Sequence, residues 1–183
     1  MRHTESVATP GGRVEVVVEG SGKTLVMLPS LGRDGYDDFD TVAALLAAGH
    51  TVLRPQPRGI GGCSGKLEGV SLHHMADDIA HVINALGGGR AVILGHAFGH
   101  FVARMTAVDY PDLVRGVVLA AAAARQYAPE IAATPRIAGN LALPDSERLA
   151  ALRLGFFAEG HDPRPWLHGW HPATQRMQID CRE

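Results

Sequence analysis

The stretch that decides the fold is AVILGHAFG, residues 91–99. Its first four residues are apolar and follow the glycine triplet 87–89, which predicts a short buried strand. The next five, GHAFG, predict a tight turn with a glycine at each end, and a helix is expected from about Ala97 to Val108. The turn places Ala97 at the end of a strand, where open α/β sheets bind their ligands.

Strand and helix patterns alternate on both sides of this unit. Apolar or β-branched runs predict strands, and amphipathic runs predict helices, one of them capped by Ser71 and ended by glycine. The predicted strands are residues 13–19, 24–28, 51–53 and 114–121, and the predicted helices are residues 36–48 and 71–86. Continuous apolar strands alternating with helices predict a three-layer, doubly wound, mostly parallel α/β sheet.

The alternation stops after Ala124. Residues 126–183 contain six prolines and no strand-like run, and therefore predict short helices. We expect residues 126–183 to form a helical lid over a core of residues 1–125. The 183 residues fit one domain, so core and lid are expected to belong together.

Charge and composition exclude several classes of function. The 17 basic and 19 acidic residues give a net charge of −2, which disfavours a nucleic-acid partner. The longest apolar run, residues 117–124, is far shorter than the ~20 residues of a membrane-spanning helix, so no membrane is expected. Cys63 and Cys181 form no metal or redox motif and are expected to be free thiols. With no signal-like segment at the start, a cytoplasmic location is expected.

Two further patterns are weighed against simpler interpretations. The residues GSGKT at 20–24 end like a phosphate-binding loop, but Val17 stands where such a loop needs its first glycine, and a strand follows instead of a helix. A hairpin turn is the preferred interpretation. His96 with His100, or His74, Asp78 and His81, have helical spacings that could bind a metal, but solvated histidines on helix faces explain them better. We expect no metal and no cofactor.

Four segments together resemble the α/β-hydrolase superfamily of the serine-hydrolase type. GHAFG at 95–99 resembles its nucleophile elbow, and LPSLG at 28–32 stands where the family has its oxyanion loop. RGIGGCS at 58–64 resembles the family's Arg-Gly-x-Gly-x-Ser loop, and DYPDLV at 109–114 is similar to the turn after the elbow helix. The resemblance implies a cofactor-free hydrolase related to ester- or lactone-cleaving enzymes, with a small apolar ester-like ligand.

The nucleophile position departs from this family pattern. Ala97 occupies it, and a methyl group cannot attack a carbonyl carbon. The resemblance still implies oxyanion donors at the backbone N–H groups of Leu31 and Phe98. Ser30 is a weak alternative nucleophile, although a loop serine more simply bonds its own backbone. We therefore expect impaired catalysis, and the alternative is a non-catalytic module that binds a small molecule or a partner.

The remaining expectations concern the lid and the sheet edge. Bulky aromatic side chains are concentrated between residues 156 and 171, where they form either the core of the lid or a wall of a ligand pocket. His96, Trp166 and Trp170 are the candidate binding residues. The family's sheet usually continues with two more strands that carry the catalytic acid and histidine, and no such strands follow here. The strand at 114–121 should then have an open edge, so we expect a homo-oligomer or a complementing fragment.

Overall fold

A computed structural model of the protein describes residues 2–122 and 126–181. Its centre is a seven-stranded sheet in the order β1-β2-β4-β3-β6-β7, with the short β5 paired to β2. The strands are β1 (His3–Thr9), β2 (Gly12–Gly20), β3 (Lys23–Leu28), β4 (His50–Pro55), β5 (Ser64–Gly65), β6 (Ala91–His96) and β7 (Val114–Ala120). The strands β4, β3, β6 and β7 run parallel to one another, whereas β1, β2 and β5 pair antiparallel.

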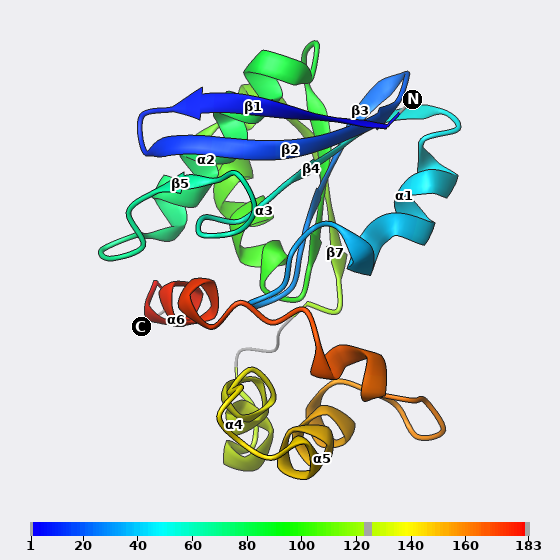
Figure 1. Ribbon diagram of the computed structural model, residues 1–183. Coiled ribbons are helices and arrows are strands. Elements are labelled where there is room, and N and C mark those ends of the chain that lie inside the picture. The colour runs from blue at the N-terminus through cyan, green and yellow to red at the C-terminus, as the bar shows by residue number, and fades with distance from the viewer. Residues whose placement is uncertain (1, 123–125, 182–183) are drawn as a thin grey trace.

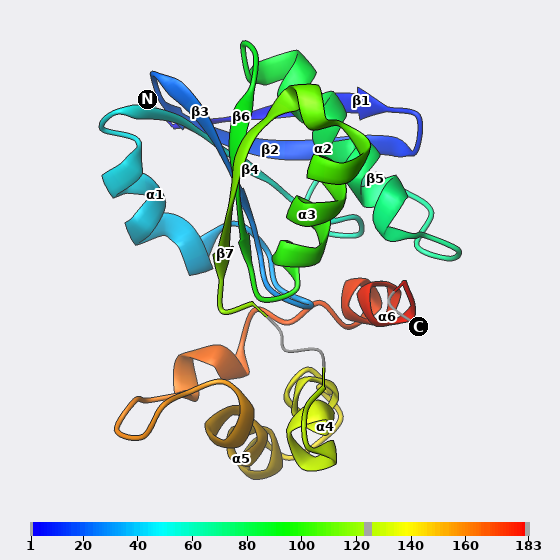
Figure 2. The same cartoon turned by 180° about the vertical axis from the view of Figure 1, so that it is seen from behind.

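Helices cover both faces of the sheet (Figures 1 and 2). One face carries α2 (Leu72–Leu86) and α3 (Gly99–Asp109), and the other carries a 3-10 turn, η1 (Asp37–Phe39), followed by α1 (Asp40–Leu46). Buried residues of both helices and of six strands form the larger apolar cluster on the α2–α3 side, and Phe39 and Ala43 pack on the other side. The predicted three-layer α/β sheet is therefore confirmed.

The helix caps follow the sequence, but two strand assignments do not. The Ser71 side chain accepts a hydrogen bond from the His74 N–H, and the helix ends at Gly87, as predicted. β1 was not predicted, because only one of its side chains is buried and its residues show little apolar periodicity. The hairpin turn expected at residues 20–24 is wrong: β4 lies between β2 and β3, so this turn joins strands that do not pair.

The lid lies beyond the carboxyl ends of the parallel strands (Figure 1). It consists of α4 (Pro129–Ala138), α5 (Asp145–Gly155), the 3-10 turn η3 (Arg164–Leu167) and α6 (Pro172–Asp180). No strand occurs between residues 126 and 181, as expected. The expected boundary between core and lid at residue 125 falls on residues 123–125, which lie outside the described residues.

The last strand of the sheet leaves apolar side chains in water. Val118 and Leu119 of β7 are 45% and 49% exposed, and within the described ranges β7 pairs only with β6. Successive side chains of a strand point to opposite faces, so both faces of the sheet are open at this edge. Among the described helices, none is both long enough and apolar enough to cross a membrane.

Candidate active site

The turn after β6 is strained and closely packed. Ala97 has a backbone φ of +46°, a conformation that residues other than glycine rarely adopt. Its N–H donates to the carbonyl of Ala120 on the neighbouring strand, 2.9 Å away. A Cβ at Gly95 would lie 2.5 Å from the backbone of His100, and one at Gly99 would lie 2.4 Å from the Leu28 carbonyl oxygen. Only glycine fits on either side of Ala97, so the sequence GHAFG builds this turn.

A second tight turn follows β3 at residues 30–33. The Arg33 N–H donates to the Ser30 carbonyl over 3.2 Å, and Gly32 has a φ of +65°. A positive φ at the third residue is characteristic of a type II turn and explains the glycine. Leu31 is 7% exposed, and Phe98, which follows the first turn, is 4% exposed. Within residues 2–122 and 126–181, neither backbone N–H has a hydrogen-bond acceptor.

Between the two turns and the lid lies a cavity of about 290 Å³. This volume is close to the lower end of the range of ~300–1,000 Å³ found for small-molecule pockets. The core contributes both turns, Phe101 of α3 and Ala121, which follows β7, and the lid contributes α4, the end of α5 and η3. The lining residues are Ser30, His96, Ala97, Phe98, Phe101, Ala121, Tyr127, Ile131, Ala132, Thr134, Pro135, Gly155, Phe156 and Trp166.

His96 is the titratable group next to Ala97 in this cavity. Its ring lies edge-on to Phe39 at 6.1 Å and to Trp166 at 6.4 Å between centroids. Burial among these rings lowers the pKa of His96 below its usual value, and Asp38 opposes the effect only in part. His96 is therefore neutral at pH 7 and adds no charge to an otherwise largely apolar wall.

The structure brings together most of the predicted site residues. Ser30, His96, Ala97, Phe98 and Trp166 all line the cavity. The side chain of Leu31 packs in the larger apolar cluster, and Leu31 does not line the cavity, although its neighbour Ser30 does.

Trp170 is placed differently from the other predicted binding residues. It does not line the cavity but lies in the lid core against Phe156, with a centroid distance of 6.0 Å. Sequence reasoning missed Phe101 and Thr134, whose positions on helices give no signal of a ligand site. It also missed Arg33 and Gln178, which contact residues from distant parts of the chain.

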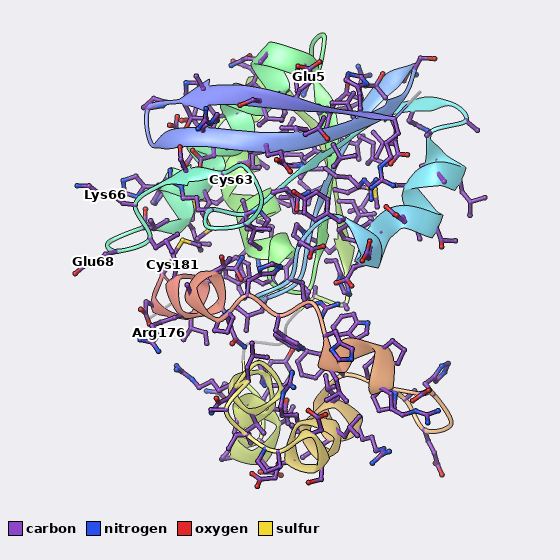
Figure 3. All side chains as sticks on the ribbon, in the orientation of Figure 1. Glu5, Cys63, Lys66, Glu68, Arg176 and Cys181 are labelled. Atoms are coloured by element: carbon purple, nitrogen blue, oxygen red, sulfur yellow. The ribbon has the colours of Figure 1, made fainter. Side chains whose placement is uncertain are left out.

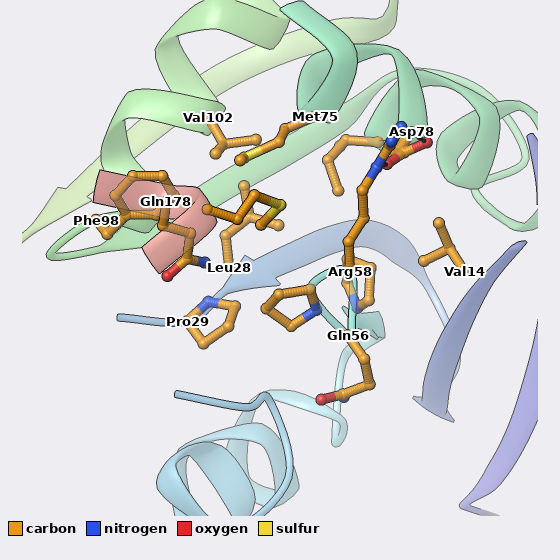
Figure 4. A pocket seen from close by; sticks show the side chains of 15 residues that line it. Val14, Leu28, Pro29, Gln56, Arg58, Met75, Asp78, Phe98, Val102 and Gln178 are labelled. Carbon is orange, nitrogen blue, oxygen red and sulfur yellow. Dashed lines mark hydrogen bonds and ion pairs between the residues drawn. The ribbon is translucent and has the colours of Figure 1, made fainter. Parts of the chain in front are cut away.

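A smaller cavity of about 50 Å³ lies next to the turn that contains Ala97 (Figure 4). Arg58 extends beside it and forms a buried ion pair with Asp78, at 2.6 Å between Nε and Oδ2. Thr9 donates a further hydrogen bond to Asp78 over 2.8 Å. This pair attaches the glycine-rich loop after β4 to α2. The cavity is too small for an organic ligand, so we assign it to packing.

The histidines singled out for metal binding have other positions. His74 forms the capping box of α2 with Ser71, and Asp78 is ion-paired with Arg58. His100 is 1% exposed and lies against Phe101. In the described part of the chain, no three His, Cys, Asp or Glu residues cluster closely enough to hold a metal ion.

The family model for the alpha/beta hydrolase fold matches residues 23–172 of this chain. The match covers most of the sheet and reaches into the lid. The chain belongs to the α/β-hydrolase fold family.

Individual relatives are hydrolases of several kinds. The chain is 34% identical over 104 residues to the soluble epoxide hydrolase of Corynebacterium sp. (strain C12), covering 57% of this chain and 36% of that protein. It is 31% identical over 109 residues to the 2-(acetamidomethylene)succinate hydrolase of Mesorhizobium japonicum (strain LMG 29417 / CECT 9101 / MAFF 303099), covering 58% and 39%. The chain thus spans less than half the length of these two relatives.

A solved structure extends the likeness to nearly the whole chain. The esterase EaEST from Exiguobacterium antarcticum superposes with a TM-score of 0.79 and 21% identity, over 99% of this chain and 74% of that one. At this identity the likeness establishes the fold alone. The relatives' chemistry therefore does not transfer by similarity and has to be argued from the residues of this site.

Proposed function

We propose that this chain binds a small apolar carbonyl compound, such as an ester or a lactone, without forming an acyl-enzyme. The observation that carries the proposal is Ala97, which occupies the strained centre of the turn at the edge of the cavity. In the family resemblance this is the nucleophile position. A methyl group has neither a lone pair nor a proton to transfer, so covalent catalysis at this position is closed.

The other parts of the site support binding. The N–H groups of Leu31 and Phe98 can donate to a carbonyl oxygen, an arrangement that also stabilises the oxyanion of acyl transfer. Phe156 and Trp166 offer apolar surface to the rest of the ligand. Among the described residues that line the cavity, His96 is the one that can carry a positive charge, and its lowered pKa keeps it neutral at pH 7. The pocket therefore suits an uncharged, largely apolar ligand.

One observation favours a second candidate function, slow hydrolysis through Ser30. Ser30 is 2% exposed and lines the same cavity as Ala97. A serine needs an adjacent base to become a useful nucleophile, and His96 is the imidazole that lines this cavity. The product would be an acid and an alcohol, formed through an ester of Ser30. Loss of turnover on Ser30→Ala would favour this alternative.

The experiment is a titration with 4-nitrophenyl butyrate, followed by quenching of tryptophan fluorescence and by release of 4-nitrophenolate. We expect saturable quenching, because Trp166 lines the cavity, and release no faster than without protein. Ala132→Trp, which fills the cavity from α4, is the control and should abolish the quenching. Stoichiometric or catalytic release of 4-nitrophenolate that the control abolishes would contradict binding without turnover.

We further propose that the chain associates with a second copy through β7. An edge strand carries unpaired backbone donors and acceptors, which two copies can satisfy in an antiparallel pair. Val118 and Leu119 would lose their exposure in such a pair. Sedimentation at increasing concentration should show a dimer or larger species, and Val118→Lys should shift it to the monomer. A monomer at all concentrations would disprove the association.

A further inference from the structure

The turn at residues 30–33 contains the Leu31 N–H, and each of its three peptide groups takes part in a hydrogen bond. The first peptide carries the Ser30 carbonyl, which accepts from the Arg33 N–H within the turn. The central peptide carries the Gly32 N–H, which donates to Oε1 of Gln178 on α6 over 2.6 Å. The third carries the Gly32 carbonyl, which accepts from the His171 N–H over 2.9 Å. Two of these three peptides are therefore fixed by the lid.

The lid also encloses this turn from the side. A Cβ at Gly32 would lie 2.8 Å from Cβ of Gln175 and 3.4 Å from the ring of Trp170. Gln178 itself is 2% exposed, and it lies alongside Phe98 and Pro29 in Figure 4. A buried amide oxygen that accepts one short hydrogen bond holds its partner in a single orientation.

The neighbouring Arg33 side chain adds a second attachment. Its guanidinium binds Asp38 at 2.6 Å and 2.9 Å and donates to the carbonyl of His168 in the lid. It also lies over the rings of Trp166 and Trp170, with 4.6 Å and 5.5 Å to the centroids. Trp166 is a wall of the cavity, so the same lid segment touches both the turn and the ligand site.

We infer that Gln178 is a positioning residue for the Leu31 N–H, and that the lid thereby sets the carbonyl affinity of the site. This inference rests on the proposed function, because it concerns the same ligand oxygen. The central peptide of a type II turn can rotate toward the type I form, which changes the backbone angles on both sides of it. The hydrogen bond to Gln178 opposes this rotation. Gln178 does not line the cavity, and it acts only through the turn.

The test compares two probes that differ in one oxygen, 4-nitrophenyl butyrate and its ether analogue, 4-nitrophenyl butyl ether. Only the ester offers a carbonyl oxygen to Leu31 and Phe98. In Gln178→Met, which keeps the shape but loses the acceptor, we expect the preference for ester over ether to fall roughly 3- to 10-fold, as for the loss of one hydrogen bond. Gln178→Glu keeps an acceptor oxygen and should retain most of the preference.

Arg176→Ala is the matched control on the same helix. Arg176 is exposed and labelled at the outer edge of α6 in Figure 3, and its replacement should leave the preference unchanged. If Gln178→Met weakens both probes equally, Gln178 is only structural and the inference is wrong.

Amide resonances separate this inference from the proposed function. In Gln178→Met we expect the Leu31 and Gly32 amide signals to shift and the Gly32 amide to exchange faster, with no ligand present. If the wild-type protein binds neither probe, the proposed function fails while this readout still tests the coupling. Unchanged Leu31 and Gly32 amides in Gln178→Met would overturn the inference.

Discussion

The two turns that form the site are adjacent in space but depend on different parts of the molecule. The turn at Ala97 is held by the core alone, through Gly95, Gly99 and the bond from its N–H to the Ala120 carbonyl. The turn at residues 30–33 is held largely by the lid, through Gln178 and the backbone of His171. One half of the site is therefore built into the sheet, whereas the other half is hydrogen-bonded to the lid.

This difference shows that the geometry of the turn at Ala97 does not depend on a reactive side chain at its centre. The strained backbone at Ala97 survives because the neighbouring glycines allow close packing, not because of its side chain. The turn at residues 30–33 instead depends on contacts between residues far apart in the chain. Substitutions in the two turns should consequently have different effects.

The largest expected effect is on the turn at Ala97. Gly99→Val would force a side chain against the Leu28 carbonyl oxygen, 2.4 Å from the new Cβ. We expect the free energy of unfolding to fall by about 3 kcal/mol or more, as for a severe steric clash in a core. Urea denaturation measures it. Gly116→Ala on β7, where a Cβ meets nothing within 4 Å, is the control and should change stability by less than about 1 kcal/mol. Equal effects would contradict the packing argument.

The next effect concerns the attachment of the lid. Arg33→Met removes the partner of Asp38, and the two side chains are only 7% and 11% exposed. Leaving one member of a buried pair unpaired should cost about 2–4 kcal/mol and loosen the lid. Urea denaturation and limited proteolysis between residues 139 and 171 measure the two effects. Arg164→Met, at an exposed ion pair with Asp162, should change neither. Unaltered proteolysis in Arg33→Met would show that the lid is held elsewhere.

A smaller effect is expected on reactivity when Ala97→Ser adds a hydroxyl group to the turn at residue 97. Ala97→Ser should label poorly with a fluorophosphonate, because a serine requires a histidine base that is itself oriented by a carboxylate. His100 lies one helical turn on but is buried against Phe101, and His171 contacts Asp34 outside the cavity. Backbone donors alone leave roughly 10³- to 10⁴-fold acceleration over water, far below a full triad. Rapid labelling that is lost on changing one of these histidines would identify a working base.

The smallest expected effect is a pH dependence of the free energy of unfolding, caused by His96 in the turn at Ala97. Because burial lowers the pKa of His96, the folded state binds its proton more weakly than the unfolded chain. The contribution of neutral His96 to the free energy of unfolding is therefore fully present above the ordinary pKa of about 6.5. It is lost as pH falls through the lower pKa of the folded state. His96→Gln should flatten this acid limb in urea denaturation at pH 7 and pH 5. An identical slope in both proteins would show that His96 does not contribute.

The same division explains what the sequence could predict. Local patterns were sufficient for β6, for the glycine-flanked turn and for the Ser71 cap, because each depends on neighbouring residues. β1 was missed because its side chains are almost all exposed, so its pairing with β2 leaves little apolar signal. The bond from Gly32 to Gln178 joins residues 146 positions apart. No spacing rule covers such contacts. The family resemblance located the loop at residues 28–32, but its attachment to the lid was not predictable.

Binding without acylation is tested most directly by the mass of the intact protein after incubation with 4-nitrophenyl butyrate at concentrations that saturate the fluorescence quenching. We expect saturable binding and an unmodified mass at every time point, because the residue at the centre of the elbow is Ala97. A gain equal to one butyryl group, located by peptide mapping on Ser30 or another residue of the cavity, would contradict it.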